Sequence, residues 1–288
     1  MPLSDFLRQR PWTSRSFLLP AELRSFPTML SPEEQRMLAF LGAAMPLETG
    51  EIVDLGPFMG GSTSAIGAGL NMRADNTRKI HSFDLFSASE QQKKQFLYSR
   101  GHPRHEGMDI YPLFQKLTDP YPVISAKQDI LKVNWDAPIE LLFIDLSKSW
   151  KINDHLIKTF FPHLVEGAIM VQQDYMFFRN PWVASTMYKL RDHVSYAGHT
   201  EYNSVLFEVN RALDAAALEG CLEAHTSQDE ILAAFDWSER FCQTYQAVEM
   251  LDMMRWAVRK NHAGRAHDDF EKCAWPSVLG EARRRWHA

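Results

Sequence analysis

Short apolar runs alternate with helical stretches through the first two thirds of the chain. The runs are apolar along most of their length, and the segment 152–164 between two of them repeats apolar residues at helical spacing. Strands of this kind are typical of a parallel sheet covered by helices on both faces. The pattern therefore predicts an α/β fold with five strands, near residues 51–55, 79–84, 121–126, 140–145 and 168–173.

Both ends of this region carry different patterns. Residues 1–30 are rich in Pro, Ser, Arg and Phe and predict an N-terminal arm. Ser31-Pro32-Glu33-Glu34 then combines an N-cap, a proline at the first helical position and a capping-box glutamate. We expect a main domain over residues 31–210. Its last strands are predicted at 193–197 and 203–209, as an antiparallel pair joined by a turn at Gly198-His199-Thr200.

The strand pattern disappears after residue 210. Residues 211–288 predict a helical C-terminal extension, in which apolar residues fall near one helical face: Phe241, Tyr245, Val248, Leu251 and Val258. We expect the Met and Trp residues of the extension to pack on the core or to form a contact between two copies of the chain, which makes a homodimer through the extension an open alternative.

Composition excludes several classes of protein. The 288 residues include 45% hydrophobic residues and carry a net charge of −5, which argues against a nucleic-acid-binding protein. No apolar run approaches the ~20 residues of a membrane span, and the N-terminus lacks the pattern of a secretion signal. Three cysteines without metal-ligand spacing predict free thiols. The expected location is the cytoplasm. The cysteines are Cys221, Cys242 and Cys273.

A glycine-rich turn follows the first predicted strand, in Glu51-Ile-Val-Asp-Leu-Gly-Pro-Phe-Met-Gly-Gly-Ser-Thr63. Glycine permits positive φ and close approach of a ligand, and the following helix N-terminus offers unpaired N–H groups. The turn can therefore hold a nucleotide-like ligand, or it can be a tight turn without one. Its spacing is neither that of dinucleotide-binding enzymes nor that of a P-loop. The candidate binding residues are Asp54, Gly56, Pro57, Gly60, Ser62 and Thr63.

Acidic residues occur at or just after the ends of all five predicted strands: Asp54, Asp84, Asp129, Asp145 and Asp174. Ligands of parallel sheets bind at the carboxyl ends of the strands. Asp84 can accept the two hydroxyls of a ribose in a nucleotide-like cofactor such as NAD, or it can cap the segment that follows.

The glycine turn resembles motif I of the class I S-adenosylmethionine (SAM)-dependent methyltransferases. The segments Phe143-Ile-Asp-Leu-Ser-Lys-Ser-Trp150 and Leu164-Val-Glu-Gly-Ala-Ile-Met-Val-Gln-Gln-Asp-Tyr175 resemble the branch that contains the macrocin O-methyltransferases. The resemblance covers about residues 35–210. It implies a Rossmann-like, mostly parallel seven-stranded sheet with an antiparallel edge strand. It also implies SAM bound by the six residues of the turn together with Asp84, Gln128, Asp129 and Asp145.

The sequence departs from this family at the expected reacting centre. Leu146 replaces a small residue, Lys148 replaces a histidine, and Gln173 stands where metal-dependent relatives have a carboxylate. Asp145, Gln173 and Asp174 can still offer three oxygen ligands, so a Mg²⁺ site is one possibility.

Methyl transfer to a hydroxyl requires alignment of the acceptor and removal of its proton. Lys148 is the candidate base if burial or a nearby cation lowers its pKa, and otherwise a lysine paired with Asp145 or Asp154. Asp145 and Asp174 are expected to face the reacting centre. The segment His102-Pro-Arg-His105, Tyr111 and Met176-Phe-Phe178 are expected to wall the acceptor pocket.

These observations predict O-methylation of a small molecule, such as a glycoside or another natural-product intermediate. Two alternatives stay open from the residues. One is a SAM- or ligand-binding protein on the same fold without catalysis. The other is a tailoring enzyme with different chemistry on that fold.

Overall fold

The computed structural model describes residues 3–46, 50–74, 77–201, 204–243, 245–261 and 263–271. Its centre is a seven-stranded sheet in the order β3-β2-β1-β4-β5-β7-β6. Strands β1 to β5 pair in parallel, whereas β7 runs antiparallel to both β5 and β6. The strands are β1 Glu51–Leu55, β2 Ile80–Asp84, β3 Val123–Lys127, β4 Ile139–Ile144, β5 Leu164–Gln172, β6 Val194–His199 and β7 Val205–Val209.

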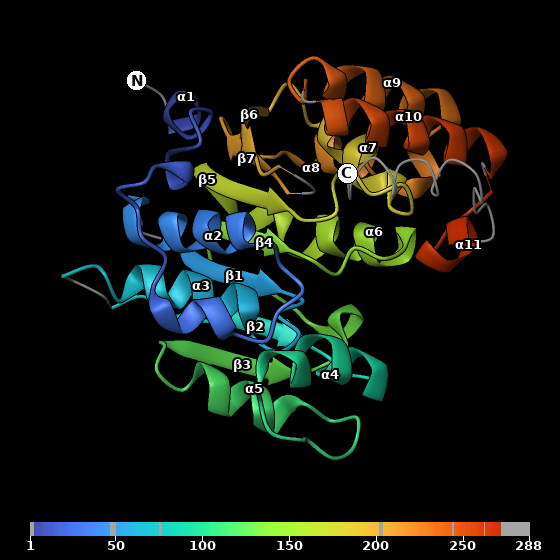
Figure 1. The fold of residues 1–288 in the computed structure, drawn as a ribbon. Coiled ribbons are helices and arrows are strands. Elements are labelled where there is room, and N and C mark those ends of the chain that lie inside the picture. The colour runs from blue at the N-terminus through green and yellow to red at the C-terminus, as the bar shows by residue number, and fades with distance from the viewer. Residues whose placement is uncertain are drawn as a thin grey trace.

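Helices cover the sheet and its ends (Figure 1). The α-helices are α1 Leu3–Leu7, α2 Pro32–Ala44, α3 Gly61–Leu70, α4 Glu90–Phe96, α5 Tyr111–Thr118, α6 Trp150–Thr159, α7 Pro181–Lys189, α8 Ala215–Gly220, α9 Gln228–Glu239, α10 Tyr245–Lys260 and α11 His267–Glu271. Short 3₁₀ turns are η1 Pro11–Thr13, η2 Ala21–Ser25, η3 Tyr98–Arg100, η4 Ile130–Lys132, η5 Phe161–His163 and η6 Glu223–His225.

The predicted fold class is confirmed, and all five predicted strands are present with ends displaced by a few residues at most. The predicted turn at Gly198-His199-Thr200 is wrong. Gly198 and His199 lie within β6, opposite Leu206 and Val205. The register shifts just before Gly198, whose φ of +134° accommodates the irregularity. A glycine in this sequence therefore marks a bulge rather than a chain reversal.

Strand β4 shows why the sheet is buried on both faces. Its side chains alternate, so Leu141 and Phe143 join one core cluster while Leu142 and Ile144 join the other. All four are at most 1% exposed. Helices α2 and α3 cover the first face, and α6 and α7 cover the second. This two-sided burial accounts for the continuous apolar runs in the sequence.

The N-terminal residues pack on the first face. Leu7, Trp12 and Leu23 are at most 1% exposed and belong to the same cluster as α2 and α3. The indole Nε1 of Trp12 donates to Glu33 Oε1 at 3.0 Å. The predicted capping box of α2 is confirmed, since Glu34 N donates to Ser31 Oγ and Ser31 N donates to Glu34 Oε2.

The C-terminal extension packs on the second face. Leu251 and Val258 of α10 are 0% and 2% exposed and share a core cluster with Phe207 of β7. Met250 and Met254 of the same helix are 6% and 0% exposed and belong to this cluster, so the predicted core packing is confirmed for these two methionines. The contact between copies of the chain and the domain limits at residues 30 and 210 stay predictions.

The predicted free thiols are confirmed for Cys221 and Cys242, which are buried. Cys273 lies outside the described residues. Within the described segments, no helix is both long enough and apolar enough to cross a membrane.

Candidate functional site

A cavity of about 720 Å³ opens at the carboxyl ends of the parallel strands. Eight of the residues predicted for binding or catalysis line it: Gly56, Asp84, Gln128, Asp129, Asp145, Lys148, Gln173 and Asp174. The remaining lining residues are mostly apolar: Met29, Phe58, Leu85, Gln92, Ile130, Leu146, Ile152, Phe177 and His267. These predicted residues lie in the loops that follow β1 to β5, which meet at one edge of the sheet because the five strands are parallel.

Asp54 lies beneath the glycine turn rather than in the cavity. It is 0% exposed and accepts hydrogen bonds from Ser62 Oγ at 2.9 and 3.0 Å and from Thr63 Oγ1 at 2.5 Å. Burial raises the pKa of Asp54 to about 7, against the lowering effect of the two hydroxyl donors. The polar atoms of these three side chains therefore hold the start of α3 against the end of β1, and the predicted contact of Asp54, Ser62 and Thr63 with a ligand stays a prediction.

Two glycines give the turn its shape. Gly56 has φ +90°, and a Cβ there would lie 2.8 Å from the carbonyl oxygen of Asp145. Gly60 has φ +97°, and its Cβ would lie 2.7 Å from Thr118 Cγ2. Gly56 lines the cavity, whereas Pro57 and Gly60 are buried and are not among its lining residues, so their predicted contact with a ligand stays a prediction.

Asp84 joins the turn after β1 to the loop after β2. Its Oδ2 accepts the backbone N–H of Phe58 at 3.0 Å, and its Oδ1 accepts that of Phe86 at 2.6 Å. Burial raises the pKa of Asp84, and these backbone N–H groups oppose the rise. Each carboxylate oxygen keeps a second lone pair for a ligand hydroxyl. The side chain is thus fixed in position while it still faces the cavity.

Three non-glycine residues beside the cavity adopt left-handed backbone conformations. Phe58, Phe86 and Asp174 have φ of +53°, +50° and +58°, after β1, β2 and β5 respectively. Such conformations are costly for bulky side chains and cluster at functional sites. They follow three of the parallel strands, β1, β2 and β5, at the edge of the sheet where the cavity opens.

The loop after β3 completes the wall beside Asp84. Gln128 N donates to the carbonyl oxygen of Asp84 at 2.9 Å, and Asp129 Oδ1 accepts Leu131 N at 3.1 Å. Asp129 thus caps η4 while lining the cavity. Both residues follow β3 directly, as the sequence predicted, and Gln128 lies next to the tip of β2.

Lys148 lies between two carboxylates. Its Nζ donates to Asp145 Oδ1 at 3.0 Å and to Asp174 Oδ2 at 2.5 Å. Burial by itself would lower the pKa of Lys148, but the two carboxylates raise it above its ordinary value. A general base would need a lowered pKa, so the prediction that Lys148 is the base is wrong. Lys148 is an ammonium ion. The alternative pairing with Asp145 is confirmed.

The same contacts bear on the predicted Mg²⁺ site. The ammonium group of Lys148 takes the position between Asp145 and Asp174 that a cation would need. Gln173 adds only a neutral oxygen, and no group of three acidic, histidine or cysteine side chains suited to a metal occurs among the described residues. As placed, these residues do not fit Mg²⁺, and that expectation is corrected.

His267 is a cavity residue that the sequence reasoning missed. It comes from α11 in the C-terminal extension, and its backbone N–H donates to the carbonyl oxygen of Lys148 at 2.9 Å. An isolated bridge pairs the preceding Ala266 with Ser149 in antiparallel fashion. No sequence signal joins this residue to the site, because the contact depends on how the extension returns to the sheet.

The predicted acceptor wall is correct in only one part. Phe177 lines the cavity, but Met176 is 1% exposed and belongs to the core. In the loop before β3, His102 and His105 hydrogen bond to carbonyl oxygens of Ser25 and Asp109, and Tyr111 donates to Ser125 O at 3.0 Å. This loop thus satisfies its own polar groups and does not line the cavity.

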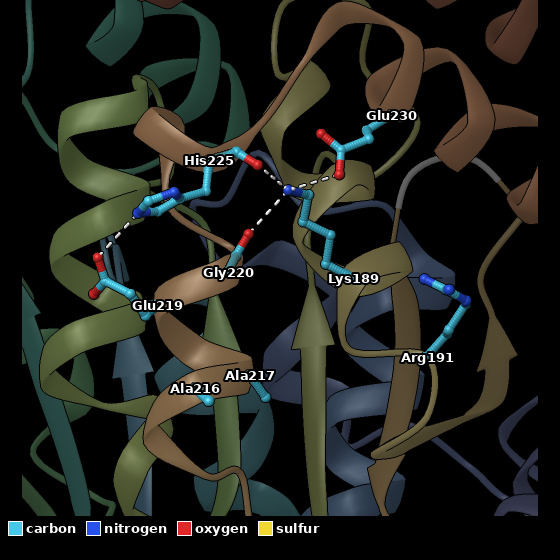
Figure 2. A pocket seen from close by; sticks show the side chains of 8 residues that line it. All are labelled: Lys189, Arg191, Ala216, Ala217, Glu219, Gly220, His225 and Glu230. Atoms are coloured by element: carbon cyan, nitrogen blue, oxygen red, sulfur yellow. Dashed lines mark hydrogen bonds and ion pairs between the residues drawn. The ribbon is translucent and has the colours of Figure 1, made fainter.

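A second hollow of about 470 Å³ lies between α7, α8 and α9 (Figure 2). Its central group, Lys189 Nζ, donates to Gly220 O at 2.9 Å and to His225 O, and it pairs with Glu230 at 3.1 Å. Because these partners already surround the ammonium group, Lys189 fastens α7 to the extension. The hollow carries no further evidence of a ligand.

Comparison with known proteins adds a likeness of fold. The strand order and directions are those of the class I methyltransferase fold. Solved structures similar to this chain include the O-methyltransferase NovP, with 14% identity, 64% of this chain and 83% of that chain covered, and a TM-score of 0.48. They also include CalS11, a TDP-rhamnose 3′-O-methyltransferase of calicheamicin biosynthesis, with 16% identity, 72% and 92% covered, and a TM-score of 0.47.

A third similar structure is an O-methyltransferase from Bacillus cereus in complex with SAH. It has 16% identity, covers 72% of this chain and 100% of that chain, and has a TM-score of 0.40. No protein-family model and no curated protein sequence matches the chain.

Proposed function

We propose that this protein is a SAM-dependent methyltransferase that acts on a hydroxyl of a small molecule. One observation supports it most: Asp84 is fixed by the backbone N–H groups of Phe58 and Phe86 while its carboxylate faces the cavity. A carboxylate at the tip of the second strand, beside a glycine turn, suits the ribose hydroxyls of the donor.

The lining residues also fit the other parts of the donor. Gly56 lines the cavity at the end of β1, and Gln128 and Asp129 line it after β3, where the proposal puts the adenine ring. When bound, SAM supplies a methyl group on a positively charged sulfur. Two carboxylates and one ammonium group meet at Lys148, and their net negative charge favours a cationic ligand.

Gln173 supplies a further sign of a ligand. Its Oε1 is buried and has no hydrogen-bond partner within the described part of the chain, although the residue lines the cavity. Buried acceptors without partners are rare because they lose hydrogen bonds to water. A hydrogen-bond donor on a bound molecule would give this oxygen a partner.

For the acceptor, we propose a small molecule, of the glycoside or natural-product intermediate type, methylated in the cytoplasm. The mixture of Phe177 and Leu146 with polar groups at one end of the cavity suits a compact organic molecule. The net charge of −5 does not suit a nucleic acid. A contact between two copies through the extension stays part of this proposal.

One observation favours a second candidate, a SAM-binding protein without catalysis. Lys148, the base predicted from sequence, is held as an ammonium ion by Asp145 and Asp174. A protein that binds the donor but lacks a base would have the same glycine turn and the same Asp84.

Both candidate functions require that the protein bind SAM. Calorimetric titration of the full chain with the product S-adenosylhomocysteine (SAH) tests this requirement. We expect micromolar binding with one site per chain and no change on addition of Mg²⁺. Absence of binding would overturn both candidates, and binding of NADH in place of SAH would indicate a dinucleotide enzyme. Release of SAH from SAM with a methylated acceptor then separates the enzyme from the binding protein.

A further inference from the structure

The end of the C-terminal extension is fastened to the loop after β4. The carbonyl oxygen of Arg265 accepts Trp150 N at 2.9 Å, and His267 N donates to Lys148 O at 2.9 Å. The bridge between Ser149 and Ala266 lies between these two bonds. Figure 1 shows α11 next to α6, at the side toward which the arrow of β1 points. The extension therefore reaches the cavity through fixed backbone contacts.

The ring of His267 is also held. Its Nδ1 lies 3.1 Å from Oδ1 of Asn180, a residue that is 1% exposed at the start of α7. The ring packs against Phe177 with their centroids 5.3 Å apart. An amide oxygen only accepts hydrogen bonds, so Nδ1 carries the proton and Nε2 keeps its lone pair. No described residue forms a hydrogen bond with Nε2.

The surroundings of His267 keep the imidazole neutral. Burial lowers its pKa, and the nearby charges of Arg179 and Lys148 lower it further. The carboxylates of Asp174 and Asp268 act in the opposite direction, but the net shift is downward. At neutral pH the ring is therefore a proton acceptor, in contrast to the ammonium group of Lys148.

We propose that His267 is the general base of the reaction and that the C-terminal extension completes the active site by supplying it. The inference rests on the proposed function. As the acceptor oxygen bonds to the methyl carbon, the bond from that carbon to sulfur breaks and its electron pair stays on sulfur, giving SAH. The hydroxyl proton passes to Nε2, and the resulting imidazolium returns it to water. Asn180 is a positioning residue, which fixes the tautomer.

The first test measures the tautomer directly. Long-range ¹H–¹⁵N correlation spectra of ¹⁵N-histidine-labelled full chain, with SAH present, separate a protonated Nδ1 from a protonated Nε2. His267→Gln identifies the signal among the eleven histidines. We expect a neutral ring with the proton on Nδ1 and a pKa below the ordinary ~6.5. A proton on Nε2, or a charged ring at neutral pH, would overturn the base.

Asn180→Asp tests the positioning role. The carboxylate still accepts from Nδ1–H but adds a negative charge, so the pKa of His267 should rise. An unchanged pKa would show that the two side chains do not interact, and it would remove Asn180 from the mechanism.

The second test measures turnover with methyl-labelled SAM and catechol as the acceptor probe. His267→Gln should lower kcat by about 100-fold or more while the SAH Kd changes less than about twofold. His225→Gln, at an exposed histidine 52% accessible to solvent, is the matched control and should leave both values unchanged. Equal turnover of His267→Gln and the native protein would overturn the proposal.

The outcomes separate the two proposals. Failure to bind SAH removes the proposed function, whereas SAH binding with the proton on Nε2 removes only the base. If the native protein does not methylate catechol, the first test alone decides whether His267 is the base, because the tautomer and pKa of His267 are measured without an acceptor.

Discussion

Nζ of Lys148 lies 2.5 Å from Oδ2 of Asp174, so a lysine on one strand-end loop is ion-paired with a carboxylate on the next. The second partner, Asp145, follows β4 directly at 3.0 Å. This triad neutralises part of the negative charge at the cavity and occupies the position between the two carboxylates. Its removal should change both stability and cation binding.

Lys148→Met should lower the free energy of unfolding by about 1–2 kcal/mol, less than for a fully buried pair because 38% of the lysine side chain is exposed. Lys148 opposes the burial that raises the pKa of Asp145, so this pKa rises further without the ammonium group. The folded state then binds extra protons, and the loss of stability grows as pH increases. Urea unfolding at about pH 5 and about pH 8 measures this. Lys151→Met, at an exposed position, is the control.

The same variant tests the corrected metal site. With Lys148 replaced, Asp145, Gln173 and Asp174 are free to offer oxygens to Mg²⁺. Mg²⁺ should then raise the unfolding temperature of Lys148→Met and leave that of the native protein unchanged. Equal stabilisation of both proteins by Mg²⁺ would mean that the lysine does not compete with the metal.

Asp84→Asn should weaken SAH binding by about 1–3 kcal/mol, which is about 5- to 150-fold in Kd. The amide retains one acceptor oxygen for the backbone N–H of Phe58 or Phe86, but it cannot accept from both while also holding a ribose. Calorimetry gives the Kd. Asp109→Asn, at an exposed carboxylate paired with Lys127 away from the cavity, should bind SAH as the native chain does. Equal affinities would remove Asp84 from the site.

Asp54→Asn tests the raised pKa beneath the turn. The pKa of Asp54 is about 7 in the folded state and near 3.8 ordinarily, so between these values the folded state holds a proton that the unfolded chain releases. Native stability should therefore fall by up to about 1.4 kcal/mol per pH unit as pH rises through this range. Asp54→Asn should flatten the profile. Asp119→Asn, at an exposed carboxylate, should keep the native slope.

Gly60→Ala tests whether close approach, and not only positive φ, requires glycine in the turn. The new Cβ would lie 2.7 Å from Thr118 Cγ2, at φ +97°. Gly107→Ala is the control, because Gly107 has a φ of +75° and an added Cβ would have nothing within 4 Å. This variant should therefore lose only the free energy of holding a non-glycine residue at positive φ, about 1 kcal/mol. We expect a clearly greater loss of unfolding free energy for Gly60→Ala. Equal losses of unfolding free energy in the two variants would show that the neighbours of Gly60 can move to accommodate the Cβ without a measurable loss of stability.

The sequence predicts the sheet well because burial on both faces leaves continuous apolar runs. It also locates the cavity, since acidic residues such as Asp84 and Asp145 follow strands whose carboxyl ends must meet. Two properties lie beyond it. The charge of Lys148 depends on the left-handed turn that brings Asp174 to its Nζ. Likewise, the burial of the Asp54 side chain depends on how α3 packs against β1.

His267 illustrates a different limit. Its helix, α11, is only five residues long and shows no apolar periodicity that would place it. The contact with Asn180 spans 87 positions, so it follows from the docking of α9 and α10 on the sheet rather than from local pattern. Sequence motifs of the sheet therefore identify the side of the cavity that contains Asp84 and miss the side that contains His267.

The bridge between Ser149 and Ala266 has a consequence for synthesis of the chain. The sheet strands all precede residue 210, so they can pair while the extension is still inside the ribosome. The loop after β4 acquires its partner only when the segment around Ala266 has emerged. A nascent chain would therefore form the part of the cavity that contains Asp84 before His267 reaches it, and the activity proposed above would appear only after this late step of folding.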